Sequence, residues 1–152
     1  MKNPEEIDPD WARYAETVLS FGGEPPFELD LREVLPPEAH AEFSSRGLTG
    51  TFAVLTAHDP HGRDLSGAEN MALQKQLESQ LARDGVPFVR VDACSTDRKH
   101  CECSVAIDVL QHRAVDLAVQ YDQMGIFWFD GEAFWLIGGI VQSDPILLPR
   151  TA

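Results

Sequence analysis

Two apolar runs on either side of an Asp-Gly pair constrain the fold of this chain more than any other feature. Residues 125–137 read Gly-Ile-Phe-Trp-Phe, then Asp130-Gly131, then Glu-Ala-Phe-Trp-Leu-Ile. An Asp-Gly pair between apolar runs favours a two-residue type I′ turn, which makes the runs the strands of a β-hairpin. If Phe129 pairs with Glu132, both faces are apolar and both must be covered, by helices or by a second subunit. The two predicted faces carry Phe127, Phe129, Phe134 and Leu136 on one side and Ile126, Trp128, Ala133, Trp135 and Ile137 on the other.

A buried strand and a capped helix precede this hairpin. The continuous apolar run 51–57 predicts a central strand that is buried on both faces. Ser66 and Glu69 have the spacing of a capping box, with Ser at the N-cap and Glu at N3. A helix should therefore begin at Ser66 and run to about Arg83.

Asn70 lies on the predicted buried face of that helix. It comes three residues before Leu73 and seven before Leu77, so all three share one side. A buried amide needs hydrogen-bond partners, and the polar loop just before the helix is the nearest source. We therefore expect Asn70 to point inward and to bind that loop.

The rest of the chain predicts further helices and strands. Asp8-Pro9 resembles an N-cap followed by a first-turn proline, and apolar residues then recur at helical spacing. We expect an N-terminal helix at about 9–20, a weak strand near 27–31, strands at 86–91 and 101–109, and a helix at about 111–122.

This order of elements predicts an α/β or α+β fold. We expect a mixed β-sheet with helices packed on its faces and a C-terminal β-hairpin. A length of 152 residues fits a single domain over 1–152. Its core should span about 27–140, and the C-terminal tail 141–152 is apolar enough to pack against it.

Charge and cysteine content narrow the class of partner. With 12 basic and 25 acidic side chains, the net charge of −13 argues against a nucleic-acid polymer or an anionic membrane as partner. No apolar stretch reaches the roughly 20 residues of a membrane span, and the polar N-terminus is unlike a signal peptide. Three cysteines are an odd number, which favours free thiols over a disulfide framework. A soluble cytoplasmic protein is the expectation.

Several segments together resemble a known family. They are Trp11-Ala-Arg-Tyr14 with Thr17, the loop Thr56-Ala-His-Asp-Pro60 running to Ser66 and Asn70, the strand His100-Cys-Glu-Cys-Ser104, and Gln123 before Ile126-Phe127-Trp128. The chain is similar in these to the bacterial domain of unknown function 3293 family. The family pattern has Asn where this chain has Asp59, which exchanges a hydrogen-bond donor for an acceptor. The resemblance implies no activity, and it points to Glu102 and Ser104.

The loop 56–70 is the predicted functional site. His58, Asp59 and His61 follow the end of a buried strand, where open α/β sheets place their ligands. Two imidazoles and a carboxylate can act as acid, base or metal ligand. The alternative is a turn in which Asp59 caps its own backbone and the histidines face water.

A second polar strand completes the predicted pocket. Glu102 and Ser104 share one face of the strand at 101–109, and they meet the loop if this strand lies beside 51–57. The alternative is a hydrogen-bond network that only pins the loop to the sheet. Asp59 or Glu102 is then the candidate base, with His58 as proton carrier. The candidate ligand-binding residues are Thr56, Ser66, Asn70, Ser104 and Gln123, of which Gln123 has the alternative of capping the helix end.

A zinc site is the weaker alternative. Thiolates and imidazole suit Zn²⁺, but the cysteine spacing is not that of a C-x2-C knuckle, and small thiols also pack well inside a sheet. The residues concerned are Cys94, His100, Cys101 and Cys103. The cofactor is unknown, because no phosphate-binding glycine loop or serine nucleophile motif is present.

Two functions remain open from the sequence. In the first, the loop 56–70 binds or acts on a small polar or nucleotide-like ligand. In the second, the chain is a non-catalytic protein-binding or regulatory module with an acidic surface. A homodimer through the aromatic hairpin would fit the second function.

Overall fold

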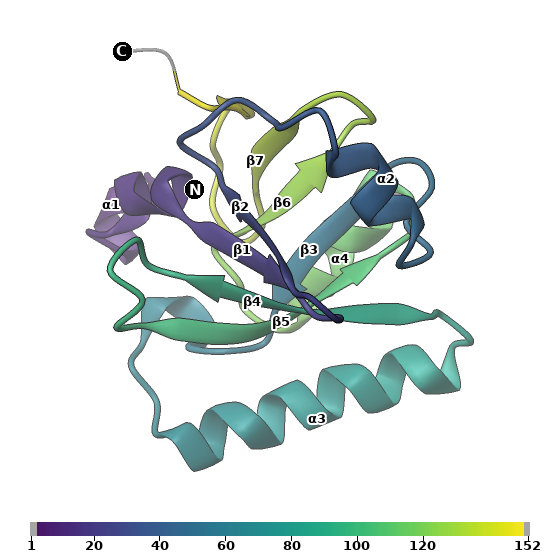
Figure 1. Ribbon diagram of the computed structural model, residues 1–152. Helices are drawn as coiled ribbons and strands as arrows, with labels where there is room; N and C mark the ends of the chain where they lie inside the picture. The colour runs from purple at the N-terminus through teal and green to yellow at the C-terminus, as the bar shows by residue number, and fades with distance from the viewer. Residues whose placement is uncertain (1–2, 151–152) are drawn as a thin grey trace.

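One curled antiparallel sheet organises the molecule (Figure 1). The computed structural model describes residues 3–150, and eight strands of these residues lie in the order β2-β1-β4-β5-β3-β6-β7-β8. The strands are β1 (Val18–Phe21), β2 (Phe27–Asp30), β3 (Phe52–Thr56), β4 (Phe88–Cys94), β5 (Cys101–Ile107), β6 (Gly125–Phe129), β7 (Phe134–Gly138) and β8 (Ile146–Leu148). The helices are α1 (Pro4–Ile7), α2 (Ala39–Ser44), α3 (Gly67–Arg83) and α4 (Gln111–Gln120), with 3-10 turns η1 (Trp11–Glu16) and η2 (Pro60–Gly62).

The fold is α+β, and the prediction of a mixed sheet is wrong. Each neighbouring pair of strands in residues 3–150 is antiparallel. Helix α3 connects β3 to β4, which run in the same direction, but β5 lies between them in the opposite direction. In the same way α4 connects β5 to β6, and β3 separates them. Two strands joined by a helix are often parallel neighbours, which is why a mixed sheet was predicted. Here a third, antiparallel strand lies between the two strands in both cases.

The predicted N-terminal helix over about 9–20 is also wrong. Residues Trp11–Glu16 form only the 3-10 turn η1, and Val18–Phe21 form β1. Strand β1 pairs with β2 on one side and with β4 on the other. The apolar spacing of this segment fits a helix as well as a strand, and the backbone hydrogen bonds of two neighbouring strands decide the outcome.

The sheet separates two apolar layers. Helices α3 and α4 cover the convex face, where Leu77, Leu81 and Leu117 pack against the sheet. The concave face is filled in part by Phe43 of α2, which lies among aromatic side chains of the strands. Helix α3 begins with the predicted capping box of Ser66 and Glu69, so its start was fixed by local sequence.

Strands β6 and β7 pair with a register that differs from the prediction. Phe129 pairs with Phe134 and not with Glu132, so the loop between the two strands is two residues longer than predicted. A slip of two residues leaves every side chain on its own face, because strand side chains alternate with a period of two. The predicted faces are therefore retained: Phe127 and Phe129 lie in the concave layer, and Ile126 lies in the convex layer.

The chain beyond β7 joins the sheet and the core. Strand β8 pairs with the outer side of β7, and Val141 and Leu148 are buried in the concave layer. The predicted tail 141–152 therefore contributes a strand within its described part. None of the helices in residues 3–150 has the length and apolar character needed to cross a membrane.

Two of the three cysteines form a disulfide, so the expectation of free thiols is wrong for them. Cys94 and Cys101 lie directly opposite each other at the end of the β4–β5 hairpin and are bonded. Cys103 is the free cysteine of the described chain. The strand register brings the two sulfur atoms together, and sequence spacing alone does not reveal it.

Candidate functional site

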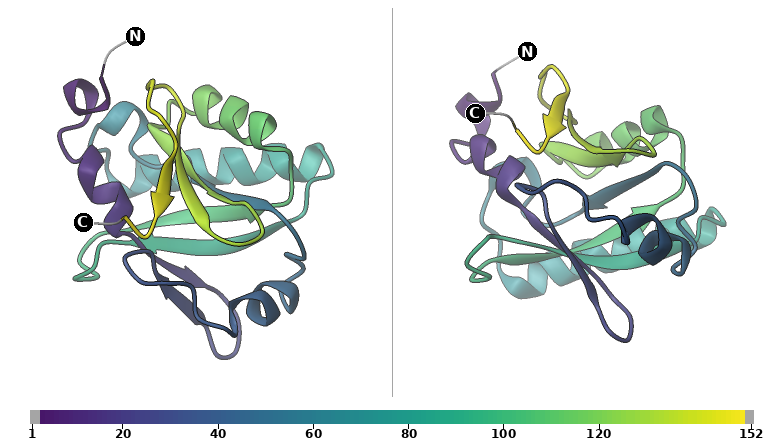
Figure 2. Two further views of the ribbon diagram at one scale, coloured as in Figure 1. Left: turned by 90° about the horizontal axis from the view of Figure 1, so that it is seen from above. Right: turned by 45° about the horizontal axis from the view of Figure 1, so that its top comes forward.

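A cavity of about 400 Å³ opens on the concave side of the sheet, beside η1. Its walls come from the ends of β3 and β4, the starts of β5 and β6, and the segment between α1 and β1. Segments from the two ends of the chain, within residues 4–12 and 143–150, lie side by side (Figure 2). The polar side chains that line it include Asp8, Arg13, Tyr14, Thr17, Thr56, His58, Asp59, Asp64, His100, Glu102, Ser104 and Gln123.

Two hydrogen bonds join Asp59, in the loop after β3, to Asn70, in the first turn of α3. The backbone N–H of Asp59 donates to Oδ1 of Asn70 at 2.8 Å, and Nδ2 of Asn70 donates to Oδ1 of Asp59 at 2.8 Å. The backbone N–H of Leu65 donates to the same Asp59 oxygen at 3.0 Å. Asn70 is 7% exposed, so it points inward and binds the preceding loop as predicted. These bonds leave the second Asp59 oxygen, Oδ2, free to face the cavity.

Thr56 and Gln123 pin the backbone of the same loop. Strand β3 lies beside β5 with Thr56 opposite Ser104, which is the arrangement that the predicted pocket required. The hydroxyl of Thr56 donates to the carbonyl of Cys103 at 2.7 Å and accepts from the N–H of His58 at 3.1 Å. Nε2 of Gln123 donates to the carbonyl of His58 at 3.0 Å and to that of Tyr121, so it both braces the loop and caps α4.

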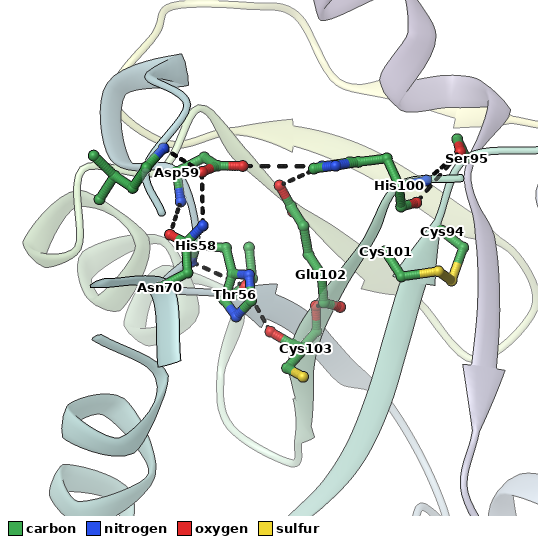
Figure 3. A network of polar contacts seen from close by, with 12 residues as sticks. Thr56, His58, Asp59, Asn70, Cys94, Ser95, His100, Cys101, Glu102 and Cys103 are labelled. Carbon is green, nitrogen blue, oxygen red and sulfur yellow. Dashed lines mark hydrogen bonds and ion pairs between the residues drawn. A yellow bond between two sulfur atoms is a disulfide. The ribbon is translucent and has the colours of Figure 1, made fainter. Parts of the chain in front are cut away.

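An imidazole lies between two carboxylates at the cavity wall (Figure 3). Nε2 of His100 is 3.4 Å from Oε1 of Glu102 and 3.9 Å from Oδ2 of Asp59. One ligand atom of each residue lies within 4.8 Å of the other two. His100 was predicted only as part of a cysteine cluster, and the structure places it with the two carboxylates.

Burial changes the acid–base properties of this group. Loss of water around Glu102 raises the pKa of its carboxyl to about 7, and the neighbouring Asp59 raises it too, whereas His100 opposes the rise. Burial lowers the pKa of His58, which favours the neutral imidazole. His58 is 8% exposed, and its Nε2 has no hydrogen-bond partner among the described residues. The predicted turn with histidines facing water therefore holds for His61, which is exposed, and not for His58.

Tyr14 and Asp8 belong to the cavity, and our sequence reasoning did not assign them to it. The hydroxyl of Tyr14 donates to Oδ2 of Asp8 at 2.7 Å. Burial and the adjacent Asp8 carboxylate raise the pKa of Tyr14. The signal that was available is the resemblance itself, because Tyr14 and Thr17 are among the residues that carry it. Interpretation of this segment as a helix separated them from the site.

The predicted site residues divide into two groups. Ser66 and Asn70 do not line the cavity: the Ser66 hydroxyl accepts from the N–H of Glu69 as the N-cap of α3, and Asn70 acts through Asp59. His61 does not line it either. The cavity is lined by the other predicted catalytic and ligand-binding residues, namely Thr56, His58, Asp59, Glu102, Ser104 and Gln123. Ser104 is buried, and its hydroxyl donates to the carbonyl of Glu102 at 3.3 Å.

The cysteine-based zinc site is not formed. Cys94 and Cys101 are joined by a disulfide and have no thiolate to offer. Cys103 alternates with Glu102 along β5 and so lies on the other side of the strand. Only His100 of the four predicted zinc ligands faces the cavity with other ligand atoms near it.

Comparison with known proteins finds a family match over part of the chain, and that match carries no activity. Residues 55–126 match the family described as "Protein of unknown function (DUF3293)". The resemblance predicted from the sequence is confirmed over these residues, which include the loop, α3, β5 and Gln123. No curated protein matches the chain, and no solved structure matches it.

Proposed function

We propose that the cavity beside β3 and β5 binds a small ligand that combines an apolar part with a neutral or cationic polar part. The observation that carries this proposal is the lining of one cavity by both kinds of side chain. Phe127 and Leu136 offer apolar surface, and Asp59 and Glu102 offer carboxylates. Pockets of this size with a few convergent polar groups are the usual form of small-molecule sites.

The charge of the lining favours a neutral or cationic ligand over a phosphate. Five carboxylates line the cavity, and Arg13 is its one arginine or lysine side chain. A phosphate would be repelled by these carboxylates, because water that screens them is partly excluded. The sequence suggested either a small polar ligand or a nucleotide-like ligand. A polar metabolite, or a nucleoside without its phosphate, fits this lining better than a nucleotide does. The carboxylates are those of Asp8, Asp10, Asp59, Asp64 and Glu102.

The same residues supply the chemistry if the site is catalytic. Asp59 or Glu102 accepts a proton from the ligand, and the neutral imidazole of His58 carries it onward. The support is geometric: Asp59 is held by three hydrogen bonds, and His58 lies beside it with a free ring nitrogen. Asn70 then positions Asp59 and does not contact the ligand.

A thermal-shift screen in EDTA tests this proposal with matched ligand pairs. The pairs are adenosine with its 5′-monophosphate, and putrescine with succinate, each at several concentrations. A ligand that binds only the folded protein raises its apparent stability by mass action. We expect the neutral or cationic member of a pair to raise Tm in the wild type and to lose its effect in Asp59→Asn and Glu102→Gln. Glu132→Gln, which changes an exposed carboxylate elsewhere, serves as the control.

Two outcomes would contradict the proposal. One is a larger shift with the anionic member of each pair. The other is an equal shift in the wild type and both cavity variants, which would place the ligand elsewhere.

A non-catalytic acidic module is the alternative function. Its support is the net charge of −13, which suits a basic protein partner. Both faces of the β6–β7 pair are packed within the chain, so the hairpin gives little reason to propose a homodimer. A cytoplasmic location is likewise a proposal, and the disulfide is more typical of oxidising compartments.

A further inference from the structure

We infer that Asp59, His100 and Glu102 form a divalent metal site, with Zn²⁺ or Mn²⁺ as the fitting ions, at the wall of the proposed ligand cavity. This inference deepens the proposed function, because it rests on the same cavity and names the cation that the carboxylates hold. The three side chains come from two separate places in the chain, the loop after β3 and the start of β5. The fold alone brings them together.

The distances suit three ligands of one ion. Protein oxygen and nitrogen ligands lie about 2.0–2.2 Å from Zn²⁺, so ligand atoms in a tetrahedral site are roughly 3.4 Å apart. Nε2 of His100 is 3.4 Å from Glu102 Oε1 and 3.9 Å from Asp59 Oδ2. The three ligand atoms all lie within 4.8 Å of one another, so they need to move by only about a few tenths of an ångström toward a common centre.

Two of the three ligands, Asp59 and His100, are held by contacts that leave the binding atom free. Oδ1 of Asp59 accepts from Leu65 and Asn70, so Oδ2 remains for the ion. Three hydrogen bonds join the backbone of His100 to Ser95. The Ser95 N–H donates to the His100 carbonyl at 2.8 Å, the Ser95 hydroxyl donates to the same carbonyl at 3.3 Å, and the His100 N–H donates to Ser95 Oγ at 3.2 Å. Such outer contacts orient ligands before the metal arrives and strengthen binding.

Electrostatics favours a cation at this place. Two carboxylates converge in a partly buried position, with Asp8, Asp10 and Asp64 nearby on the same lining. Charges of one sign that are brought together with little water repel each other strongly. The side chain of His100 carries at most one positive charge, whereas a divalent ion supplies two between the same oxygens.

A second observation points to a missing group at the same cavity. His58 lines the cavity, is 8% exposed, and has a ring Nε2 without a partner among the described residues. Buried polar atoms are satisfied in almost all native proteins, and an exception needs an explanation such as a bound ion, water or ligand. A metal-bound water would supply such a partner.

The ligand set identifies the class of ion. Two carboxylates and one imidazole suit borderline divalent ions, and the lack of an available thiolate at the site makes it unsuited to soft ions such as Cu(I). Three protein ligands leave a fourth position for water, as in catalytic rather than structural zinc sites. Because all three ligands line the cavity, the open position is accessible to a small ligand there.

Isothermal titrations with ZnCl₂ and, separately, with MnCl₂ test the site directly. The untagged wild-type protein is stripped with EDTA, exchanged into chelator-free buffer without reductant, and titrated beside His100→Ala, Asp59→Asn and two controls. His100→Ala removes a ligand whose side chain is 63% exposed, so folding should be preserved. Asp59→Asn keeps an Oδ1 acceptor for Leu65 and Asn70 and removes only the free carboxylate oxygen. The controls are His112→Ala, at an exposed site on α4, and Cys103→Ser, which removes the free thiol.

We expect the wild type to bind one Zn²⁺ per chain and both controls to bind it equally. His100→Ala and Asp59→Asn should bind at least about 100-fold more weakly, because loss of an outer-shell partner alone costs about 10–100-fold. Circular dichroism melts confirm that the variants are folded. The inference is overturned if the wild type does not bind Zn²⁺ or Mn²⁺, if the ligand variants bind as tightly as the wild type, or if Cys103→Ser abolishes binding.

The experiment separates this inference from the proposed function. An organic ligand that raises Tm in EDTA, with no Zn²⁺ binding in titration, would support the ligand cavity and overturn the metal site. Zn²⁺ binding that needs His100 and Asp59, with no organic ligand found, would support the metal site and contradict the proposed small-ligand function.

Discussion

The two ends of the concave face are built from the same strands and are filled in opposite ways. Along β3, Phe52 lies at one end of this face and Thr56 at the other, with Val54 between them. At the Phe52 end, the ring centroid of Phe43 is 5.1 Å from those of Phe52 and Phe129. At the Thr56 end there is a cavity of about 400 Å³ with converging carboxylates.

This difference indicates that the Phe52 end of the concave face stabilises the fold and that the Thr56 end does so less. Aromatic rings in edge-to-face contact, such as Phe43 with Phe52 and Phe129, bury large apolar areas and stabilise the fold. Buried carboxylates without full compensation destabilise it, and positions that break the rules of folding are those where function is expected. We therefore expect substitutions at the aromatic end to change stability most, and substitutions at the cavity end to change binding and pH response.

The largest expected effect is that of Phe43→Ala. Phe43 is 1% exposed and packs against aromatic rings of five strands, so its loss leaves a large void. The free energy of unfolding should fall by about 3–5 kcal/mol, measured by urea denaturation. Phe43→Leu fills part of the void and should cost clearly less. A decrease below about 1 kcal/mol in the free energy of unfolding of Phe43→Ala would contradict the view that the aromatic end contributes more to stability than the cavity end.

The disulfide gives the next largest effect, at the cavity end. The bond between Cys94 and Cys101 closes a short loop with a sequence separation of 7, and it holds His100 next to β4. Chain-entropy arguments give about 2 kcal/mol for a loop of this length. Urea denaturation of the Cys94→Ser/Cys101→Ser double variant should show this loss, and added reductant should destabilise the wild type but not the variant. Equal sensitivity to reductant in both proteins would contradict this role.

Asn70→Ala should cost about 1–3 kcal/mol. The substitution removes both hydrogen bonds between Asn70 and Asp59 and leaves the Asp59 N–H without this partner. Thermal or urea unfolding measures the loss, and Met71→Ala at the exposed neighbour is the control. Zn²⁺ affinity should fall along with stability, because Asn70 orients Asp59. If Asn70→Ala unfolds like Met71→Ala, the loop does not depend on this pair.

The smallest expected effect is a change in pH dependence. The pKa of Glu102 is about 7 in the folded metal-free chain, against an ordinary value of 4.5. Folding therefore takes up a proton, so the stability from Glu102 is fully present below pH 4.5 and is lost as pH rises toward about 7. Between pH 5 and pH 8, Glu102→Gln should remove a decline in stability on the order of 1 kcal/mol. Unfolding measured in EDTA over this range tests it, and parallel curves for the two proteins would contradict it.

Local patterns determined much of the candidate site. The capping box of Ser66 and Glu69, the inward amide of Asn70 and the buried strand before the loop all follow from spacings of a few residues. The apolar faces of β6 and β7 were also predictable, since alternation survives a two-residue error in register. Each of these features is set by residues that are only a few positions apart in the sequence.

Pairing between strands that are far apart in the sequence decided the remaining features of the fold and of the candidate site. The pairing of Val18–Phe21 with two strands replaced a predicted helix, and strand insertion made the sheet antiparallel. The register of β5 with β4 made Cys101 half of a disulfide with Cys94. The pairing of β5 with β3 brought His100 to Asp59 across about 40 residues of sequence. The sequence by itself determined the buried strand β3, the capped start of α3 and the apolar faces of β6 and β7, because these features depend on neighbouring residues. Tertiary structure alone decided which polar side chains share a cavity, because hydrogen bonds between distant strands fix that choice.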